Sequence, residues 1–213
     1  MASPPPLPAK EDHEAEIKTD TETPYSSAKR FEDLNLSKEL LQGLYTEMKF
    51  ERPSRIQAIT LPMVLEPPHK HLIAQAHNGS GKTTCFVLSM LSRVDAAVSA
   101  PQAICVCPTR ELAVQNLQVL QRMGKYTQVK AVCTAFDQQD FDGPTSKRPT
   151  LTDHVVIGTH GKLKNWMQKR RSGAPVLPMD NIRILVFDEA DVMMDEHGQK
   201  DDSIRMIREM TTK

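Results

Sequence analysis

The chain of 213 residues has no long apolar run, few cysteines and no excess of either charge. No hydrophobic stretch approaches the ~20 residues that a membrane-spanning helix needs, and the N-terminus lacks the apolar core of a signal peptide. We therefore expect no membrane span. The formal net charge of zero excludes a global basic field. It does not exclude RNA, because a local stripe can be basic while the total is neutral.

The four cysteines form no CxxC pair and have no pair of histidines at metal-ligand spacing beside them. They are Cys85, Cys105, Cys107 and Cys133. Each lies among apolar residues, where a free thiol behaves as a small hydrophobe. This usage favours core thiols of a reducing compartment over a metal site.

The charges are unevenly placed along the chain. Residues 1–24 contain six acidic residues and two lysines, a net charge of −4, so the remainder carries +4. The first 29 residues are also rich in proline and nearly free of large apolar side chains. Such a segment cannot bury enough surface to offset its ordering entropy. We therefore expect a disordered tail over 1–29 and one domain over 30–213.

Beyond the tail, the hydrophobic pattern predicts two helices and then an alternation of strands and helices. The first helix is expected to begin after Ser37 as N-cap and to end near Met48, and the second to span 56–65. Strands are predicted at 71–75, 103–107, 129–134, 154–158 and 182–187, and helices at 82–94, 110–126, 162–171 and about 202–210. Apolar strands separated by such helices are typical of an α/β fold with a parallel sheet covered on both faces. The polar insertion at 137–153 is predicted to be a mobile loop.

The segment AHNGSGKT, residues 76–83, follows a predicted strand and opens a predicted helix. Gly79 and Gly81 permit the backbone turns that direct consecutive N–H groups at one anion. Lys82 supplies a cation for the β- and γ-phosphates, and the Thr83 hydroxyl can bind Mg²⁺. Ala76 stands where the general phosphate-loop pattern has its first glycine. The alternative is a glycine-rich turn that only caps a helix, and the order of strand, loop, Lys-Thr and helix disfavours it.

In the segment LVFDEADVMM, residues 185–194, an apolar run ends in two adjacent acids and a third follows. A carboxylate at the end of a buried strand is costly unless a positive group faces it. Mg²⁺ bridging nucleotide phosphates meets that need, so Asp188 is predicted to hold the metal ion. Glu189 is then available to orient or deprotonate the attacking water, and Asp191 to tie this loop to another motif. A solvated strand end is the alternative.

Together these residues resemble the DEAD-box RNA helicases, whose DEAD motif stands at 188–191 without a mismatch. The resemblance extends from Phe31 to Asp191. It implies a RecA-like P-loop domain with a mostly parallel sheet, ATP and Mg²⁺ as cofactors, and RNA-stimulated ATP hydrolysis. The catalytic residues that it implies are Lys82, Asp188 and Glu189, with Mg²⁺ held by Thr83 and Asp188. The implied ATP-binding residues are Phe31, Gln57, Ala76, Gly79, Ser80, Gly81, Lys82, Thr83 and Thr84.

Residues 50–57, FERPSRIQ, resemble the family's Q motif, whose glutamine reads adenine. The Gln57 amide can accept from N6 and donate to N7 at once, as it does in adenine readout in DNA. The family also places an aromatic ring upstream to stack on the base, and Phe31 occupies that place. Taken alone, Gln57 is also compatible with a surface amide and Phe31 with a residue that docks a helix.

Two further segments resemble motifs that contact RNA phosphates, PTRELA at 108–113 and GTHGK at 158–162. The implied RNA contacts are Thr109, Arg110, Thr159, Gly161 and Lys162. His160 departs from the proline that most members have, which loosens the second motif. Arg110 alone is also compatible with a solvated helix start. Trp166 is better explained by packing than by base stacking, and KRR at 169–171 by an exposed helix end.

Within the family, the segments PSRIQ, AQAHNGSGKTTCFVLSMLSRVD and QAICVCPTRELAVQ are most similar to the mRNA-export branch, in particular its plant members. This implies a monomer of nucleus and cytoplasm that acts on messenger ribonucleoprotein at the nuclear pore. The expected partners are RNA and nuclear-pore or mRNA-export factors. The family's SAT motif and second RecA-like domain do not follow the predicted helix at 202–210. We therefore expect the N-terminal half of a helicase, inactive or very slow by itself. The alternative is a non-catalytic module that binds ATP, RNA or a partner.

Overall fold

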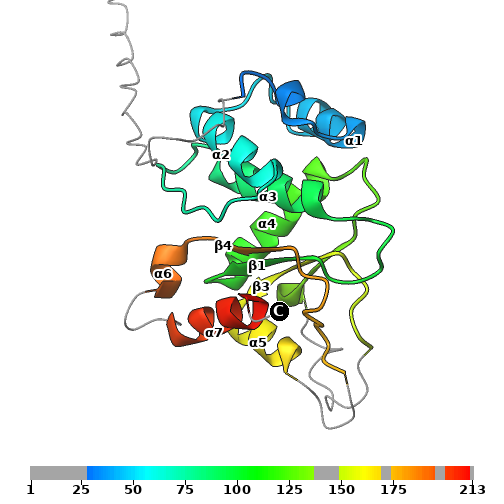
Figure 1. The fold of residues 1–213 in the computed structure, drawn as a ribbon, viewed down its shortest axis with the longest axis vertical. Helices are drawn as coiled ribbons and strands as arrows, with labels where there is room; N and C mark the ends of the chain where they lie inside the picture. The colour runs from blue at the N-terminus through cyan, green and yellow to red at the C-terminus, as the bar shows by residue number, and fades with distance from the viewer. Residues whose placement is uncertain (1–27, 137–148, 169–173, 195–199, 212–213) are drawn as a thin grey trace, which may run out of the picture.

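The computed structural model describes residues 28–136, 149–168, 174–194 and 200–211. Its centre is a parallel sheet of β1 (Ala103–Cys107), β2 (Ala131–Cys133), β3 (Val155–Thr159) and β4 (Ile184–Phe187), in the order β2-β3-β1-β4. Helices lie above and below this sheet (Figure 1). The predicted fold class, a parallel sheet covered on both faces, is confirmed.

The strand β1 is the centre of the sheet because it pairs with β3 on one side and β4 on the other. All five of its residues are buried, since their side chains alternate between two cores. Cys105 and Cys107 belong to one core, and Ile104 and Val106 to the other. In register, Cys107 lies opposite Thr159 and Val106 opposite Phe187. The carboxyl ends of β3, β1 and β4 therefore reach the same edge of the sheet.

The first core lies under α3 (Lys82–Arg93) and α4 (Arg110–Met123), and the second under α5 (His160–Met167), α6 (Ala190–Met194) and α7 (Lys200–Thr211). Beyond α3 and α4 lies a further helical layer (Figure 1). It consists of η1 (Phe31–Leu34), α1 (Lys38–Gln42), the π-helical η2 (Gly43–Glu47) and α2 (Arg55–Leu65). A short 3-10 turn, η3 (Thr134–Phe136), follows β2.

Most predicted elements form within a few residues of their expected ends, and β1 matches to the residue. Ser37 is the N-cap of α1, where its side chain accepts a hydrogen bond from the Leu40 N–H at 3.3 Å. The single helix expected from there to Met48 is instead α1 followed by π-helical η2. Gly43 begins this π-turn and lies against the end of α4, because a β-carbon there would overlap the Met123 carbonyl oxygen. The short helix α6 was not predicted.

The strand predicted at 71–75 is wrong. No strand forms there, and the side chain of Ile73 is 99% exposed and that of Leu72 41% exposed. A strand needs a neighbour whose N–H and C=O groups pair with its own. In the described part of the chain, no strand pairs with 71–75 or with the outer edge of β4. The apolar composition of this segment is therefore not sufficient to place it in the sheet.

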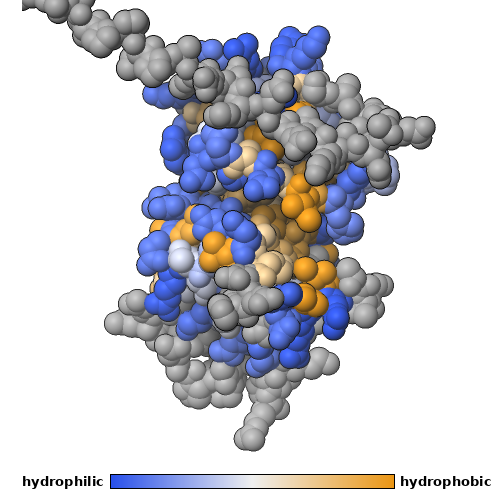
Figure 2. Space-filling model, turned by 90° about the vertical axis from the view of Figure 1, so that its left-hand side faces the viewer, coloured by the Kyte–Doolittle hydropathy of each residue, from blue (hydrophilic) through white to orange (hydrophobic). Residues whose placement is uncertain are grey.

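Figure 2 faces the left-hand side of Figure 1 and shows hydrophobic residues gathered across the middle of this face, between hydrophilic regions above and below. The segment before α3 and the helix α6 lie on this side (Figure 1). They carry the exposed side chains of Leu72, Ile73 and Val192. The edge strand β4 is half-buried along its whole length, unlike β1.

The cysteines pack as predicted, since Cys105, Cys107 and Cys133 are buried and Cys85 is half-buried, all as free thiols. Burial raises the pKa of the Cys85 thiol to about 11. No described helix has the length and hydropathy to cross a membrane. Most of the predicted tail (1–29), most of the predicted loop (137–153) and KRR at 169–171 lie outside the described residues.

Candidate functional site

The loop at 76–81 ends in the N-terminus of α3, with Gly81 as the N-cap. Gly79 has a φ of 79° and Gly81 a φ of 98°, in the left-handed region that favours glycine. A β-carbon at Gly79 would meet nothing within 4 Å, whereas one at Gly81 would overlap the Gln57 side-chain nitrogen. The loop therefore requires glycine at residue 81 for its conformation and for its packing.

The ammonium group of Lys82 bends back over this loop. Its Nζ donates to the carbonyl oxygens of Ala76 and His77, the latter at 3.0 Å. Ser80 Oγ is buried and has no hydrogen-bond partner among the described residues. A cation on neutral carbonyls and an unpaired buried hydroxyl are groups that an anion in the loop would satisfy. The donor set therefore fits a phosphate, and the adjacent Thr83 is half-buried.

Gln57 lies beneath the same loop. It is 4% exposed, which excludes the surface-amide alternative. Its Oε1 accepts from the Ser54 N–H at 3.0 Å, and its Nε2 donates to the Gly81 carbonyl at 3.2 Å. The Ser54 hydroxyl donates to the Ser80 carbonyl at 2.8 Å. The start of α2 thus holds the loop from the side through two hydrogen bonds to its backbone.

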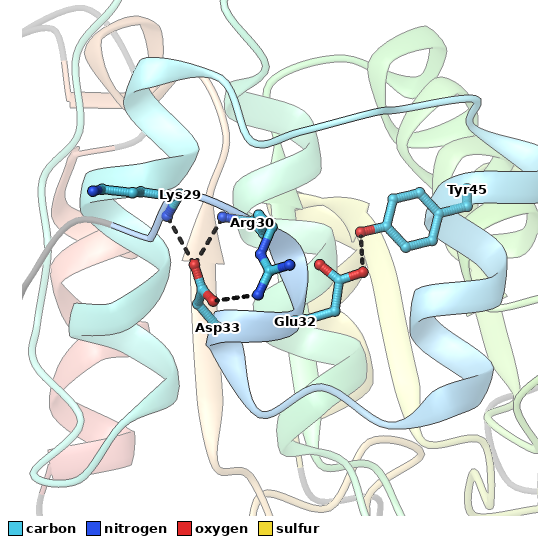
Figure 3. A network of polar contacts seen from close by, with 5 residues as sticks. All are labelled: Lys29, Arg30, Glu32, Asp33 and Tyr45. Carbon is cyan, nitrogen blue, oxygen red and sulfur yellow. Dashed lines mark hydrogen bonds and ion pairs between the residues drawn. The ribbon is translucent and has the colours of Figure 1, made fainter.

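Phe31 is fully buried and packs against Phe50, with ring centroids 6.5 Å apart, and edge-on against Tyr45 at 6.1 Å. Polar contacts fix the turn that carries it (Figure 3). The Tyr45 hydroxyl donates to Glu32 at 2.7 Å, and the Asp33 carboxylate accepts from the Arg30 N–H at 2.9 Å. Desolvation, with the bond to Glu32, raises the pKa of Tyr45 to about 12. This geometry favours the helix-docking interpretation of Phe31.

Asp188 follows β4 directly. Its N–H donates to the Val106 carbonyl at 3.0 Å and extends the pairing of β4 with β1. Its Oδ2 accepts a hydrogen bond of 2.8 Å from Nδ2 of Asn116 on α4. Sequence reasoning missed Asn116. The available signal was a polar residue within the apolar stripe of α4, where Ala113, Leu117 and Leu120 are buried beside it.

Glu189 is exposed and has a φ of 54°. A left-handed conformation costs a residue other than glycine about 1–2 kcal/mol, and residues held in this way cluster at functional sites. Asp191 is exposed in the first turn of α6. Among the described residues, no ion pair joins Lys82 to Asp188 or Glu189.

The predicted RNA contacts lie at the carboxyl ends of β1 and β3. Thr109 is the N-cap of α4, where its hydroxyl accepts from the Leu112 N–H at 3.2 Å, and Thr159 precedes α5. Both helices begin at one edge of the sheet, and helix N-termini there present N–H groups suited to phosphate. Arg110 and Gly161 are exposed, and Lys162 is half-buried.

Two other residues near this edge are core residues. His160 and Trp166 of α5 are each 1% exposed. The packing role predicted for Trp166 is therefore confirmed.

Comparison with known proteins gives a consistent result. The family model described as DEAD/DEAH box helicase matches residues 54–213. The chain is 56% identical over 200 residues to DEAD-box ATP-dependent RNA helicase 38 of Arabidopsis thaliana, covering 94% of this chain and 39% of that protein. It is 44% identical over 192 residues to ATP-dependent RNA helicase dbp5 of Schizosaccharomyces pombe, covering 90% of this chain and 36% of that one. The chain spans about two fifths of the length of these curated relatives.

Among solved structures, S. cerevisiae Dbp5 bound to RNA and ADP BeF3 matches with a TM-score of 0.72 at 41% identity, covering 85% of this chain and 43% of that one. A Dbp5 variant bound to Nup159, a Gle1 variant, IP6 and ADP matches with a TM-score of 0.70 at 40% identity, covering 82% of this chain and 43% of that one.

Proposed function

Because the chain belongs to the DEAD/DEAH box helicase family, we propose that it is the N-terminal, ATP-binding domain of an RNA helicase that remodels messenger ribonucleoprotein in mRNA export. One observation supports the proposal that the domain binds a nucleotide. The loop before α3 has two left-handed glycines, a lysine bonded only to carbonyl oxygens and an unpaired buried serine hydroxyl. These features together suit a loop that binds phosphate.

In this proposal the residues of the loop bind different parts of the nucleotide and its metal ion. Lys82 exchanges the Ala76 and His77 carbonyls for phosphate oxygens. The N–H groups at the start of α3, from Gly81 to Thr84, point toward the same anion. The Thr84 side chain itself is 5% exposed and takes part through its backbone. Thr83 and Asp188 would hold Mg²⁺, which supplies charge stabilisation to the phosphates when bound.

Adenine recognition is assigned to Gln57, beside this loop. Its amide has one N–H and one lone pair beyond the bonds to Gly81 and Ser54. Those remaining groups suit the adenine edge. Phe31 contributes from the core, by packing against Phe50 at the start of the same motif.

A nucleotide titration tests this assignment. Labelled ATP and GTP are titrated with Mg²⁺ against the wild type, Gln57→Ala and Lys82→Ala. We expect a preference for ATP in the wild type that Gln57→Ala abolishes. Lys82→Ala should weaken binding of both nucleotides by roughly 1.5–3 kcal/mol, the value of a charge-assisted hydrogen bond. Equal affinity for ATP and GTP in the wild type rejects the adenine assignment, and no loss in Lys82→Ala rejects the phosphate loop.

RNA binding is assigned to the sheet edge formed by Thr109, Arg110, Thr159, Gly161 and Lys162. The register of β1 with β3 supports this, because it brings the starts of α4 and α5 to neighbouring strand ends. Contacts to phosphate carry little sequence information, so we expect weak binding with little sequence preference. Binding should weaken as salt rises, because phosphate contacts release counterions.

Arg110→Ala and Lys162→Ala test the RNA surface. Each should weaken the binding of single-stranded RNA at low salt and lower the slope of log affinity against log salt by about one unit. Lys38→Ala is the control, because Lys38 is an exposed lysine on α1, in the outer helical layer. The assignment is rejected if the two variants bind RNA as the wild type and the control do.

Export partners are proposed from the relatives. Dbp5 is recorded with Nup159 and Gle1, and we propose corresponding nuclear-pore factors as partners of this chain. Hydrolysis, with Glu189 orienting water, is proposed for the complete helicase.

A further inference from the structure

A buried amide lies directly behind the acidic loop. Asn116 is 1% exposed, and its Nδ2 lies 2.8 Å from Asp188 Oδ2 and 3.3 Å from Cys107 Sγ. It reaches Asp188 from α4, whereas Asp188 follows β4, the strand that pairs with β1. No other side chain in the described ranges donates to this carboxylate. Asn116 is therefore the one described side chain that sets the rotation of the Asp188 carboxylate.

The chemistry of this contact suits a metal ligand. A carboxylate has two oxygens, and the amide occupies Oδ2 from the core side, which leaves Oδ1 for a cation. Because the donor is neutral, the full negative charge of Asp188 remains available. A lysine or arginine in the same place would orient the carboxylate too, but it would compete with the cation for that charge. A side chain that donates to a metal-ligating carboxylate in this way fixes its orientation.

The position of the amide is fixed by its surroundings. Asn116 lies on the buried stripe of α4, and the sulfurs of Cys105 and Cys107 on β1 flank its Nδ2. Thiols are weak hydrogen-bond partners, so the carboxylate is the dominant acceptor for this amide. Burial between the sheet and α4 prevents Asn116 from following Asp188 if the acidic loop moves.

We propose that Asn116 is a positioning residue that aims the Asp188 carboxylate at the Mg²⁺ of a bound nucleotide. The inference rests on the function proposed above. Loss of a side chain that hydrogen-bonds to a metal ligand costs about 10–100-fold in metal affinity. Asn116→Leu removes the donor while it retains a side chain of similar length. It should raise the Mg²⁺ concentration needed for half-maximal binding by about that factor.

The test is a Mg²⁺ titration of the whole chain at fixed labelled ATP. The wild type and Asn116→Leu are compared, and nucleotide affinity is also measured in EDTA. A positioning role raises the Mg²⁺ midpoint and leaves the metal-free affinity unchanged. Leu117→Ala is the matched control. Leu117 is buried beside Asn116 on α4, so this change opens a cavity without touching Asp188. It should lower the melting temperature and leave the Mg²⁺ midpoint at the wild-type value.

The outcomes separate this inference from the proposed function. A wild type whose nucleotide binding does not depend on Mg²⁺ overturns both. If nucleotide binding by the wild type depends on Mg²⁺ but Asn116→Leu has the same Mg²⁺ midpoint, only the role of Asn116 is overturned. If Asn116→Leu does not fold, the wild type still provides the test by NMR. The side-chain NH₂ signal of Asn116 should shift when Mg²⁺ is added to the ATP complex. The Mg²⁺ midpoint of this shift should equal the midpoint of the binding curve. An unchanged signal contradicts the proposal.

Discussion

Residues 71–75 and 103–107 are two pentapeptides predicted to be strands that each lead into a loop of the candidate site, and they lie in opposite environments. The second is β1, paired on both sides and buried at every residue. The first has no strand partner among the described residues and is exposed at every residue. Backbone pairing on both sides, rather than apolar composition, is what distinguishes them.

The difference also concerns how each loop is held. The loop after β1 continues from a rigid strand into α4, and Thr109 caps the helix. The phosphate loop has no such strand before it. It is held instead from the side, by Ser54, the N-cap of α2, and by Gln57 of α2, which donate to the carbonyls of Ser80 and Gly81. We infer that the nucleotide loop is the more deformable of the two, and that α2 determines its shape.

Hydrogen exchange should show the largest contrast. Amides of 103–107 require unfolding of the sheet before they exchange, whereas those of 71–75 have no strand partner. Because domain stabilities are several kcal/mol, we expect protection to differ by roughly a thousandfold or more. The measurement is exchange mass spectrometry on the chain without nucleotide. Comparable protection of the two segments contradicts the contrast.

A matched pair of substitutions tests the same contrast in free energy. Ile104→Ala empties a site that is 0% exposed and should cost about 2–5 kcal/mol of unfolding free energy. Ile73→Ala removes the same atoms from a side chain that is 99% exposed and should change the free energy by less than about 0.5 kcal/mol. Urea denaturation of both variants provides the values. A cost at Ile73 close to that at Ile104 would show that 71–75 is buried in solution.

The smallest effect concerns the hydrogen bonds by which the start of α2 holds the phosphate loop. Gly79→Ala places a methyl group in open space and should cost only the left-handed strain, about 1–2 kcal/mol. Gly81→Ala carries the same strain and also displaces the Gln57 amide. Its cost should therefore be greater, and most of the excess should disappear in a Gln57→Ala background. Thermal denaturation of the single and double variants measures it. An equal cost for both glycine variants contradicts the claim that the start of α2 determines the shape of the phosphate loop.

Local signals were sufficient for much of this fold. The predicted bounds of strand β1 are correct to the residue, because its five residues form an apolar run between polar residues and prolines. The conformations of Ser37 and of the phosphate-loop glycines follow from their residue types, because serine caps helices and glycine tolerates a positive φ. The failed strand at 71–75 and the missed Asn116 depend instead on remote partners. Asn116 meets Asp188 across 72 residues of sequence, and no local pattern contains that contact.

The central claim is that the loop before α3 binds Mg-ATP even though residues 71–75, which lead into it, form no strand. Hydrogen exchange with and without saturating Mg-ATP tests this most directly, at 79–84 and, as a remote reference, at β2. We predict slower exchange at 79–84 on addition of Mg-ATP, with β2 unchanged and a smaller effect in Lys82→Ala at the same Mg-ATP concentration. Exchange at 79–84 that Mg-ATP leaves unaltered in the wild type would contradict the claim.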